Sequence, residues 1–352
     1  MWILCLLLLS SFSVSVISLD CSFSTTYPRQ MVSYKVEPGV ISVDGKLDEE
    51  AWEEVEWTED FVDISLEETP RLRTRAKVRW DNEWLYVAAE LEEKQIWANI
   101  SHTCHCVDDQ NDQVIFHDND FEIFIDVDSS NHNYKEFEIN AANQTWDLLL
   151  NKPYGDGGFE NSSRVFGSAG FDMQPPLACG VFIEPNNALN NPEVEGRHWT
   201  VEVALPLYKL LEGSSGGTDS PRDGDFWRIN FSRVEWRVLV VGNQYVKDPA
   251  YQNEDNWVWS PQGEIAMHLP ERWGFLQFSE ATPGSTHPVT NPEWVVRQTA
   301  MAVYYAEHNF AAAHDGLFTD DVLELVEFLT WPERDPGVLL GECAGIPWIT
   351  LG

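Results

Sequence analysis

Positive charge is scarce in this sequence. It contains 22 Lys and Arg residues against 58 Asp and Glu residues, which gives a formal net charge of −36 at pH 7. A surface this acidic repels nucleic-acid phosphates and anionic lipid headgroups over a Debye length of about 8 Å at physiological salt. We therefore expect neither nucleic acid nor an anionic membrane as a partner, and interpret most of the charge as a solvated acidic surface.

Long apolar runs are also scarce, because only the first residues contain one. Residues 1–18 (MWILCLLLLSSFSVSVIS) hold an apolar stretch followed by small and polar residues, a pattern typical of a cleaved secretory signal peptide. No Lys or Arg precedes the stretch, so an uncleaved anchor stays open as an alternative. No later segment reaches the roughly 20 apolar residues of a membrane-spanning helix. We therefore expect a secreted, extracellular protein.

Cysteine is sparse, and one of the six cysteines, Cys5, lies in the predicted signal peptide. The remaining five are Cys21, Cys104, Cys106, Cys179 and Cys343. Outside the cell this number favours two disulfide bonds and one free thiol, with pairings that the sequence leaves open. His105 between Cys104 and Cys106 gives half of a zinc ligand set, but no second Cys/His pair has suitable spacing, so we predict no zinc site.

Motifs of metalloprotease and nucleotide chemistry are missing. The chain has no HExxH helix and no phosphate-cradling glycine loop. A glycosidase needs only two carboxylates about 5 to 9.5 Å apart, and Glu122 with Glu138 is one such candidate pair. Acidic pairs are common by chance in so acidic a chain. We therefore assign no catalytic residue, and glycoside hydrolysis stays an alternative to a non-catalytic function.

Alternation of apolar and polar residues is abundant. In residues 74–80 (TRAKVRW) Ala76, Val78 and Trp80 share one face, and residues 81–83 then form a turn into a second alternating segment, which predicts a β-hairpin. Further alternating segments occupy residues 121–128, 135–150, 198–207 and 227–240. Many strands with one polar face predict a mainly β fold, an antiparallel β-sandwich.

Helix is expected mainly after Pro283. Residues 292–313 are rich in Ala and periodic, and residues 320–329 follow Thr319, a suitable helix N-cap. We therefore divide the chain into a signal peptide (1–18), a β-sandwich (36–279) and a helical C-terminal extension (285–352). The extension either packs on the sandwich as a brace or docks a partner.

Three tryptophans lie close together near the end of the predicted sandwich. Strand alternation assigns Trp257 and Trp259 to one face, and Trp273 directly precedes a small glycine, Gly274. Rings of this size bury about 150–250 Å² each. We therefore expect these three side chains in the core and not on a ligand platform.

The polar faces of the strands collect carboxylates, amides and an arginine. They include Glu122, Glu138, Asn140 and Arg228. Sugar hydroxyls need fixed donors and acceptors of this kind, while the apolar face of the sugar ring packs on aromatic side chains. A solvated sheet face has the same composition, so both interpretations stay open at this point.

Seven segments in order resemble the carbohydrate-binding module family 9-like domain of the DOMON-like β-sandwich superfamily. They are VDGKLDEEAW (43–52), RWDNEWLYVAAEL (79–91), DNDFEIFIDVD (118–128), YKEFEINAANQTWDLL (134–149), WTVEVALPL (199–207), WRINFSRVEW (227–236) and NWVWSPQ with MHLPERWGFLQF (256–278). The resemblance covers about residues 36–279. It implies a β-sandwich that binds an oligo- or polysaccharide, accessory to polysaccharide recognition or catabolism outside the cell.

The resemblance carries over to the sugar site unevenly. In family members two tryptophans sandwich a terminal sugar above carboxylates and amides; here Glu122 and Asn140 match, whereas the two clamp positions hold Phe116 and Met267. The position of a basic residue holds Glu138. The expected carbohydrate-binding residues are Phe116, Glu122, Glu138, Asn140, Trp146, Arg228 and Met267. A non-sugar interaction module with a decayed site is a further alternative.

The resemblance also suggests two possible cofactors, calcium and haem. Bound calcium supports loops in family members, and we expect calcium ligands among Asp118, Asp120, Asp126 and Asp128, which offer hard oxygens near loops. The superfamily contains b-type haem domains for electron transfer, the alternative function that Met267 and His268 suggest. Because adjacent strand residues point apart, haem would need a distant ligand such as Met173, His117 or His132, and we disfavour it.

Four glycosylation sequons lead to a first prediction. In a host that glycosylates secreted proteins, we expect glycans at Asn99, Asn143 and Asn161. We expect none at Asn230, because it lies on the polar strand face assigned to binding, which a glycan would block. Mass spectrometry of peptides after enzymatic deglycosylation measures each site, and a glycan on Asn230 would contradict the site assignment.

Overall fold

The computed structural model describes residues 27–100, 113–215 and 219–328. The predicted signal peptide lies outside these ranges, as do Cys21, Cys104, His105, Cys106 and Cys343. By its internal contacts the chain divides into two units, residues 28–294 and a unit whose described residues are Tyr27 and 295–328. Within the described ranges, no helix has the length and apolarity needed to cross a membrane.

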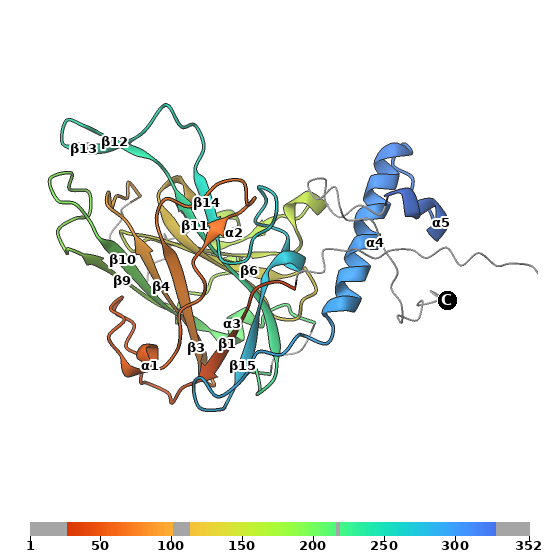
Figure 1. Cartoon of the computed structure of the whole chain (residues 1–352), viewed down its shortest axis with the longest axis horizontal. Coiled ribbons are helices and arrows are strands. Elements are labelled where there is room, and N and C mark those ends of the chain that lie inside the picture. Colours follow the sequence, from red (N-terminus) through yellow and green to blue (C-terminus); the bar gives the residue numbers. More distant parts are fainter. Residues whose placement is uncertain (1–26, 101–112, 216–218, 329–352) are drawn as a thin grey trace, which may run out of the picture. The chain divides into compact units, whose positions relative to one another are not determined.

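Residues 28–294 are built on one curled mixed sheet of thirteen strands, in the order β8-β7-β6-β5-β11-β15-β1-β3-β4-β10-β9, with β14 paired to β11 and β2 paired to β14 (Figure 1). The strands are β1 (Gln30–Lys35), β2 (Val62–Asp63), β3 (Thr74–Trp80), β4 (Trp84–Glu92), β5 (Asp120–Asp126), β6 (Tyr134–Asn140), β7 (Thr145–Leu150), β8 (Glu160–Asn161), β9 (Ala178–Glu184), β10 (His198–Pro206), β11 (Phe226–Glu235), β14 (Asp255–Val258) and β15 (Gly274–Ser279). A separate hairpin consists of β12 (Val238–Val241) and β13 (Gln244–Lys247).

Short helical turns connect these strands. They are α1 (Glu50–Glu53), η1 (Ile115–His117), η2 (Tyr154–Asp156), α2 (Ser163–Phe166), η3 (Gly167–Ala169), α3 (Leu207–Leu210) and η4 (Pro270–Arg272). Of these, η1 and η4 matter most for the site, because η1 directly precedes β5 and η4 directly precedes β15.

The predicted mainly β fold class is confirmed, and β3 and β4 form the predicted antiparallel hairpin. The predicted alternating segment 135–150 is two strands, β6 and β7, joined by a turn in which Asn143 has a φ of 59°. The sheet is mixed and not wholly antiparallel, because β1 runs parallel to both β15 and β3. Alternation reveals a strand but not its direction relative to a neighbour from the far end of the chain.

The main core lies where this sheet curls over itself. Inward residues of β5 and β6, such as Phe121 and Phe137, belong to the same buried cluster as Val78 of β3 and Val203 of β10. Cys179 of β9 is buried in this cluster as well. The three tryptophans are core residues, as predicted: Trp257 and Trp259 lie in the main core, and Trp273 lies in a second buried cluster.

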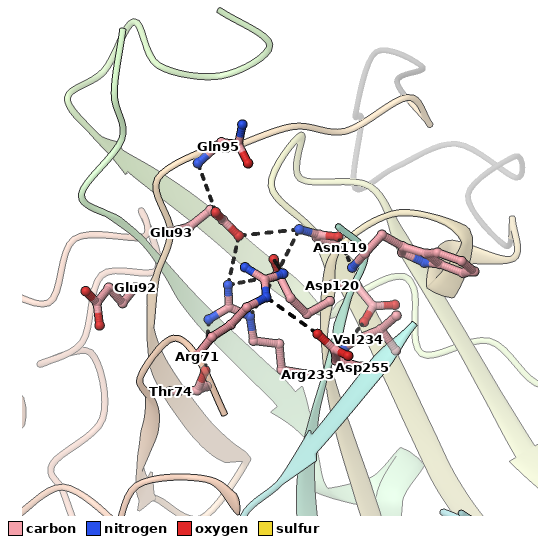
Figure 2. Close-up of polar contacts among 12 residues, drawn as sticks. Arg71, Thr74, Glu92, Glu93, Gln95, Asn119, Asp120, Arg233, Val234 and Asp255 are labelled. Atoms are coloured by element: carbon pink, nitrogen blue, oxygen red, sulfur yellow. Dashed lines mark hydrogen bonds and ion pairs between the residues drawn. The ribbon is translucent and has the colours of Figure 1, made fainter. Parts of the chain in front are cut away.

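A buried ion network fixes the start of β5 to β11 (Figure 2). The guanidinium of Arg233 on β11 donates to Glu93 Oε2 at 2.9 Å and to Glu235 Oε2 at 2.8 Å. Arg71 reaches Glu235 Oε1 at 2.6 Å. Burial, followed by the charge of Glu93, raises the pKa of Glu235 to about 8, although both arginines lower it. Asn119 joins the network because its side chain donates to Glu235 at 2.9 Å. This bond fixes Asn119, the residue that directly precedes Asp120.

The described part of the predicted C-terminal extension, which ends at residue 328, contains the predicted helices. Helix α4 spans Trp294–Ala313, and α5 (Val322–Leu325) with η5 (Val326–Phe328) follows it. Ala306, Phe310 and Leu325 form a small buried cluster of their own. The cap of α5 differs from the prediction: Asp321 accepts from the backbone N–H of Leu323, whereas the Thr319 hydroxyl donates to Glu324. Thr319 lies too far before the first helical residue to cap it.

Removing the central arginine of the network tests its contribution. We expect Arg233→Met to lower the free energy of unfolding by about 3–5 kcal/mol, because it leaves Glu93 and Glu235 buried without their shared cation. The matched control is Arg237→Met, which removes a half-buried arginine paired with Asp255 at 3.4 Å and should cost about 1 kcal/mol or less. Urea unfolding measures both, and equal losses would show that the network is not the stabilising element.

Candidate functional site

The polar face of β5, β6 and β7 is covered by a second buried layer. Apolar residues of this face pack with residues from η1 and from the segment before β15; they are Phe124, Tyr134, Trp146, Leu148, Leu150, Ile115 and Trp273. Phe116 and Met267 are half-buried at the edge of this cluster. The sequence predicted the two faces of these strands, but it gave no sign that loops cover the polar one.

Four carboxyl groups lie on this covered face and form what we call the carboxyl cluster: Asp120, Glu122, Glu136 and Glu138. Glu122 of β5 stands directly opposite Glu138 of β6 in the antiparallel register. Carboxylate oxygens of Asp120, Glu122 and Glu138 lie within 4.8 Å of one another, and within the described part of the chain this is the one group of three such side chains. The structure therefore brings together the predicted Glu122, Glu138 and Asp120, and adds Glu136.

Burial dominates the electrostatics of the cluster. Glu122 is 6% exposed and Glu138 is 1% exposed. Burial raises the pKa of Glu122 to about 7, against a hydrogen bond from Ser232 that lowers it. Burial first and the negative charge of Glu122 second raise the pKa values of Asp120, Glu136 and Glu138.

Trp146 is the predicted residue that lies beside the cluster. It stands opposite Glu138 in the register of β6 and β7, so that both side chains point to the covered face. Its indole Nε1–H is buried and has no hydrogen-bond partner in the structure. The guanidinium carbon of Arg164 lies 5.2 Å from the centre of its ring. An unused donor next to carboxylate acceptors is an arrangement that a polyhydroxylated ligand satisfies.

Asn140 and Asp118 hold the neighbouring loops. Asn140 donates to the carbonyl of Ile100 at 3.0 Å and to Asp118 Oδ2 at 3.1 Å, and its Oδ1 accepts from the backbone N–H of Gln144 at 3.0 Å. Asp118 Oδ2 also accepts from the backbone N–H groups of Asn99 and Ile100. These contacts already use the amide of Asn140, so its evident role is to hold the backbone at Ile100 and Gln144.

The four predicted calcium ligands do not gather at one place. Asp118 and Asp120 lie at the start of β5, whereas Asp126 and Asp128 lie at its end, about 20 Å away along a seven-residue strand. Asp126 accepts from the backbone N–H of Asn131 at 2.8 Å. One ion cannot bridge both ends, and only Asp120 of the four belongs to the carboxyl cluster.

Arg228 lies away from the cluster. It stands opposite Asp126 in the register, while Ser232 of the same strand stands opposite Glu122. Its guanidinium donates to the carbonyl of Trp273 at 2.6 Å and stacks on Phe275, with 3.8 Å from its central carbon to the ring centre. Arg228 therefore supports the covering segment.

The residues that suggested haem are held by other contacts. His268 Nδ1 lies 3.0 Å from the Tyr134 hydroxyl, and the Met267 carbonyl accepts from Trp273 Nε1 at 2.9 Å. Met173 packs in the main core, on the opposite face of the sheet from the cluster that His268 contacts. His117 and His132 are exposed.

The sequon at Asn230 lies in the protein interior. Its side-chain amide donates to the Ser260 carbonyl and accepts from the Ser260 N–H, both at 2.8 Å. An asparagine that is fully buried and bonded in this way has no room for a glycan, which gives the predicted unmodified state a second physical reason. Asn99 is exposed, while Asn143 and Asn161 are half-buried.

The half-buried His268 beside Met267 leads to a prediction about pH. Burial lowers the pKa of His268 to about 4, below its ordinary 6.5. Between these two pH values the unfolded chain therefore binds a proton at His268 that the folded protein does not bind. Stability should therefore fall as the pH drops from about 6.5 to 4, by at most about 1.4 kcal/mol per pH unit. His268→Gln should remove this part of the slope in urea unfolding measured across that range. An identical pH dependence of the free energy of unfolding in the wild type and in His268→Gln would refute this prediction.

Residues 43–167 match the family model described as carbohydrate family 9 binding domain-like. Among curated proteins, none matches the sequence significantly.

Three solved structures are similar to the chain at low sequence identity. A protein from Bacteroides uniformis, proposed to bind carbohydrate, is 15% identical with a TM-score of 0.48, covering 72% of this chain and 100% of that one. A carbohydrate-binding module of family 9 from Caldicellulosiruptor kristjanssonii, in complex with cellotriose, is 14% identical with a TM-score of 0.42, covering 75% and 100%. The same module in complex with glucose is 14% identical with a TM-score of 0.42, covering 74% of this chain and 100% of that one. The match over residues 43–167 supports a domain like those of carbohydrate-binding family 9 in this part of the chain.

Proposed function

We propose that this protein is a secreted carbohydrate-binding protein, accessory to polysaccharide recognition or breakdown outside the cell. The family match over residues 43–167 carries the proposal, because those residues include β5, β6 and β7. They also include most of the expected site: Phe116, Glu122, Glu138, Asn140 and Trp146. The predicted signal peptide over residues 1–18 supports secretion.

The chemistry of the covered face is suited to a sugar. Buried carboxylates accept hydrogen bonds from hydroxyl groups, and the unused Nε1–H of Trp146 donates to a hydroxyl or ring oxygen. Phe116 and Met267 are half-buried against the same cluster. An aromatic ring and a thioether provide the apolar surface on which a sugar face packs.

Glycan binding by the chain from residue 19 onward tests this proposal. We expect Phe116→Ala to weaken binding by about two- to tenfold, since a lost ring contact is worth about 0.5–1.5 kcal/mol. Trp146→Phe keeps the ring but removes the N–H donor, and should weaken binding by up to about tenfold. The matched control is Tyr208→Ala, which removes an exposed ring on α3.

A glycan array identifies the ligand, and calorimetry with that glycan gives the dissociation constants. Tyr208→Ala should bind as the wild type does. No glycan binding by folded wild-type protein, or equal binding by the wild type and Phe116→Ala, would refute the assignment. Release of shortened glycans during the assay would favour the hydrolase alternative.

A further inference from the structure

Two glutamates face each other across the strand pair at the centre of the carboxyl cluster. Directly opposed residues of an antiparallel pair have their Cβ atoms about 4.5–5.5 Å apart, and like charges in such a pair destabilise a sheet. Glu122 and Glu138 are such a pair, and Asp120 lies two residues before Glu122 on the same face. Because all three are buried, water does not screen their repulsion.

Two oxygens of the cluster are unsatisfied. Asp120 Oδ1 accepts from the backbone N–H of Val234 at 3.3 Å, but Asp120 Oδ2 has no hydrogen-bond partner. Glu138 Oε2 has none either, although Glu138 shares a hydrogen bond with Glu136 through its carboxyl group. Both residues are almost wholly buried, and each contributes one carboxylate oxygen to the group whose atoms lie within 4.8 Å of one another. Buried polar atoms in native proteins are nearly always satisfied, so these oxygens indicate a ligand.

The protein treats another pair of buried carboxylates differently. Glu93 and Glu235 are also close together, but Arg233 and Arg71 lie between and beside them and neutralise their charge (Figure 2). Among the ion pairs of the described residues, none involves a member of the carboxyl cluster. The chain therefore supplies its own cations at one buried acidic site and not at the other.

The spacing of the oxygens selects the kind of cation. Ligands that bind one Ca²⁺ at about 2.3–2.6 Å are at most about 5.2 Å apart, whereas ligands of Mg²⁺ at about 2.0–2.1 Å are at most about 4.2 Å apart. Oxygens within 4.8 Å of one another fit the first range. Three carboxylates are also the hard oxygen donors that Ca²⁺ prefers.

We propose that Asp120, Glu122 and Glu138 bind one divalent cation of the Ca²⁺ class on the covered face of β5 and β6. The ion offsets the repulsion of the opposed glutamates and satisfies the two unpartnered oxygens. Its ligands come from two paired strands, Asp120 and Glu122 from β5 and Glu138 from β6, and not from loops. It does not depend on the proposed carbohydrate function.

Calorimetry and thermal unfolding of the full chain, first treated with EDTA and then titrated with CaCl₂ or MgCl₂, test the site without any glycan. We expect one Ca²⁺ to bind and to raise the Tm by several degrees, with weaker binding of Mg²⁺. Glu138→Gln should weaken Ca²⁺ binding by about tenfold or more. In EDTA this variant should be at least as stable as the wild type, because it removes one of two opposed buried charges.

Two variants serve as controls. Glu202→Gln removes another buried carboxylate, which accepts from Trp52 Nε1 at 2.7 Å and from the Gly45 N–H at 2.8 Å; it should lower the Tm but leave Ca²⁺ affinity unchanged. Asp128→Asn changes the far end of β5 and should also leave the affinity unchanged. Wild-type protein that is folded yet binds no Ca²⁺ would overturn the proposal. Binding that Asp128→Asn abolishes and Glu138→Gln retains would overturn it equally.

Discussion

The bonds of Arg233 hold together the parts of the chain on which the site depends. This guanidinium on β11 joins Glu93, which follows β4, to Glu235 at the end of β11. Through Glu235 the network reaches Asn119, whose Oδ1 in turn accepts from the Trp236 N–H at 2.7 Å. The residue after Asn119 starts β5, so the position of every side chain along β5 follows from this anchor. Residues far apart in the sequence are thereby fixed at one buried point.

The fold also buries negative charge. The chain has a large excess of acidic residues, most of which can lie in water at little cost. The carboxyl cluster cannot, because η1 and the segment from Met267 to Trp273 cover the strand face that carries it. A buried carboxylate needs a proton, a cation or hydrogen-bond donors to be stable. The proposed cation and the proposed sugar are two ways in which the same face meets that need.

The two proposals share Glu122 and Glu138 on the covered face. Phe116 and Met267 are half-buried against the second cluster, whereas Glu122 and Glu138 are buried. A bound ion would hold the opposed strands β5 and β6 in register. Trp146 packs in the apolar cluster and stands opposite Glu138, so it lies next to both proposed ligands.

The sequence by itself determined most strands, the core tryptophans and the faces on which Glu122, Glu138 and Asn140 lie, because side-chain alternation is a local property of a strand. Tertiary structure alone decided the rest. The opposition of Glu122 and Glu138 depends on register between two strands, and their burial depends on loops that the periodicity does not describe. The separation of the four aspartates along β5, the parallel pairing of β1 and the engagement of Arg228 by Trp273 and Phe275 likewise arise from contacts between distant segments.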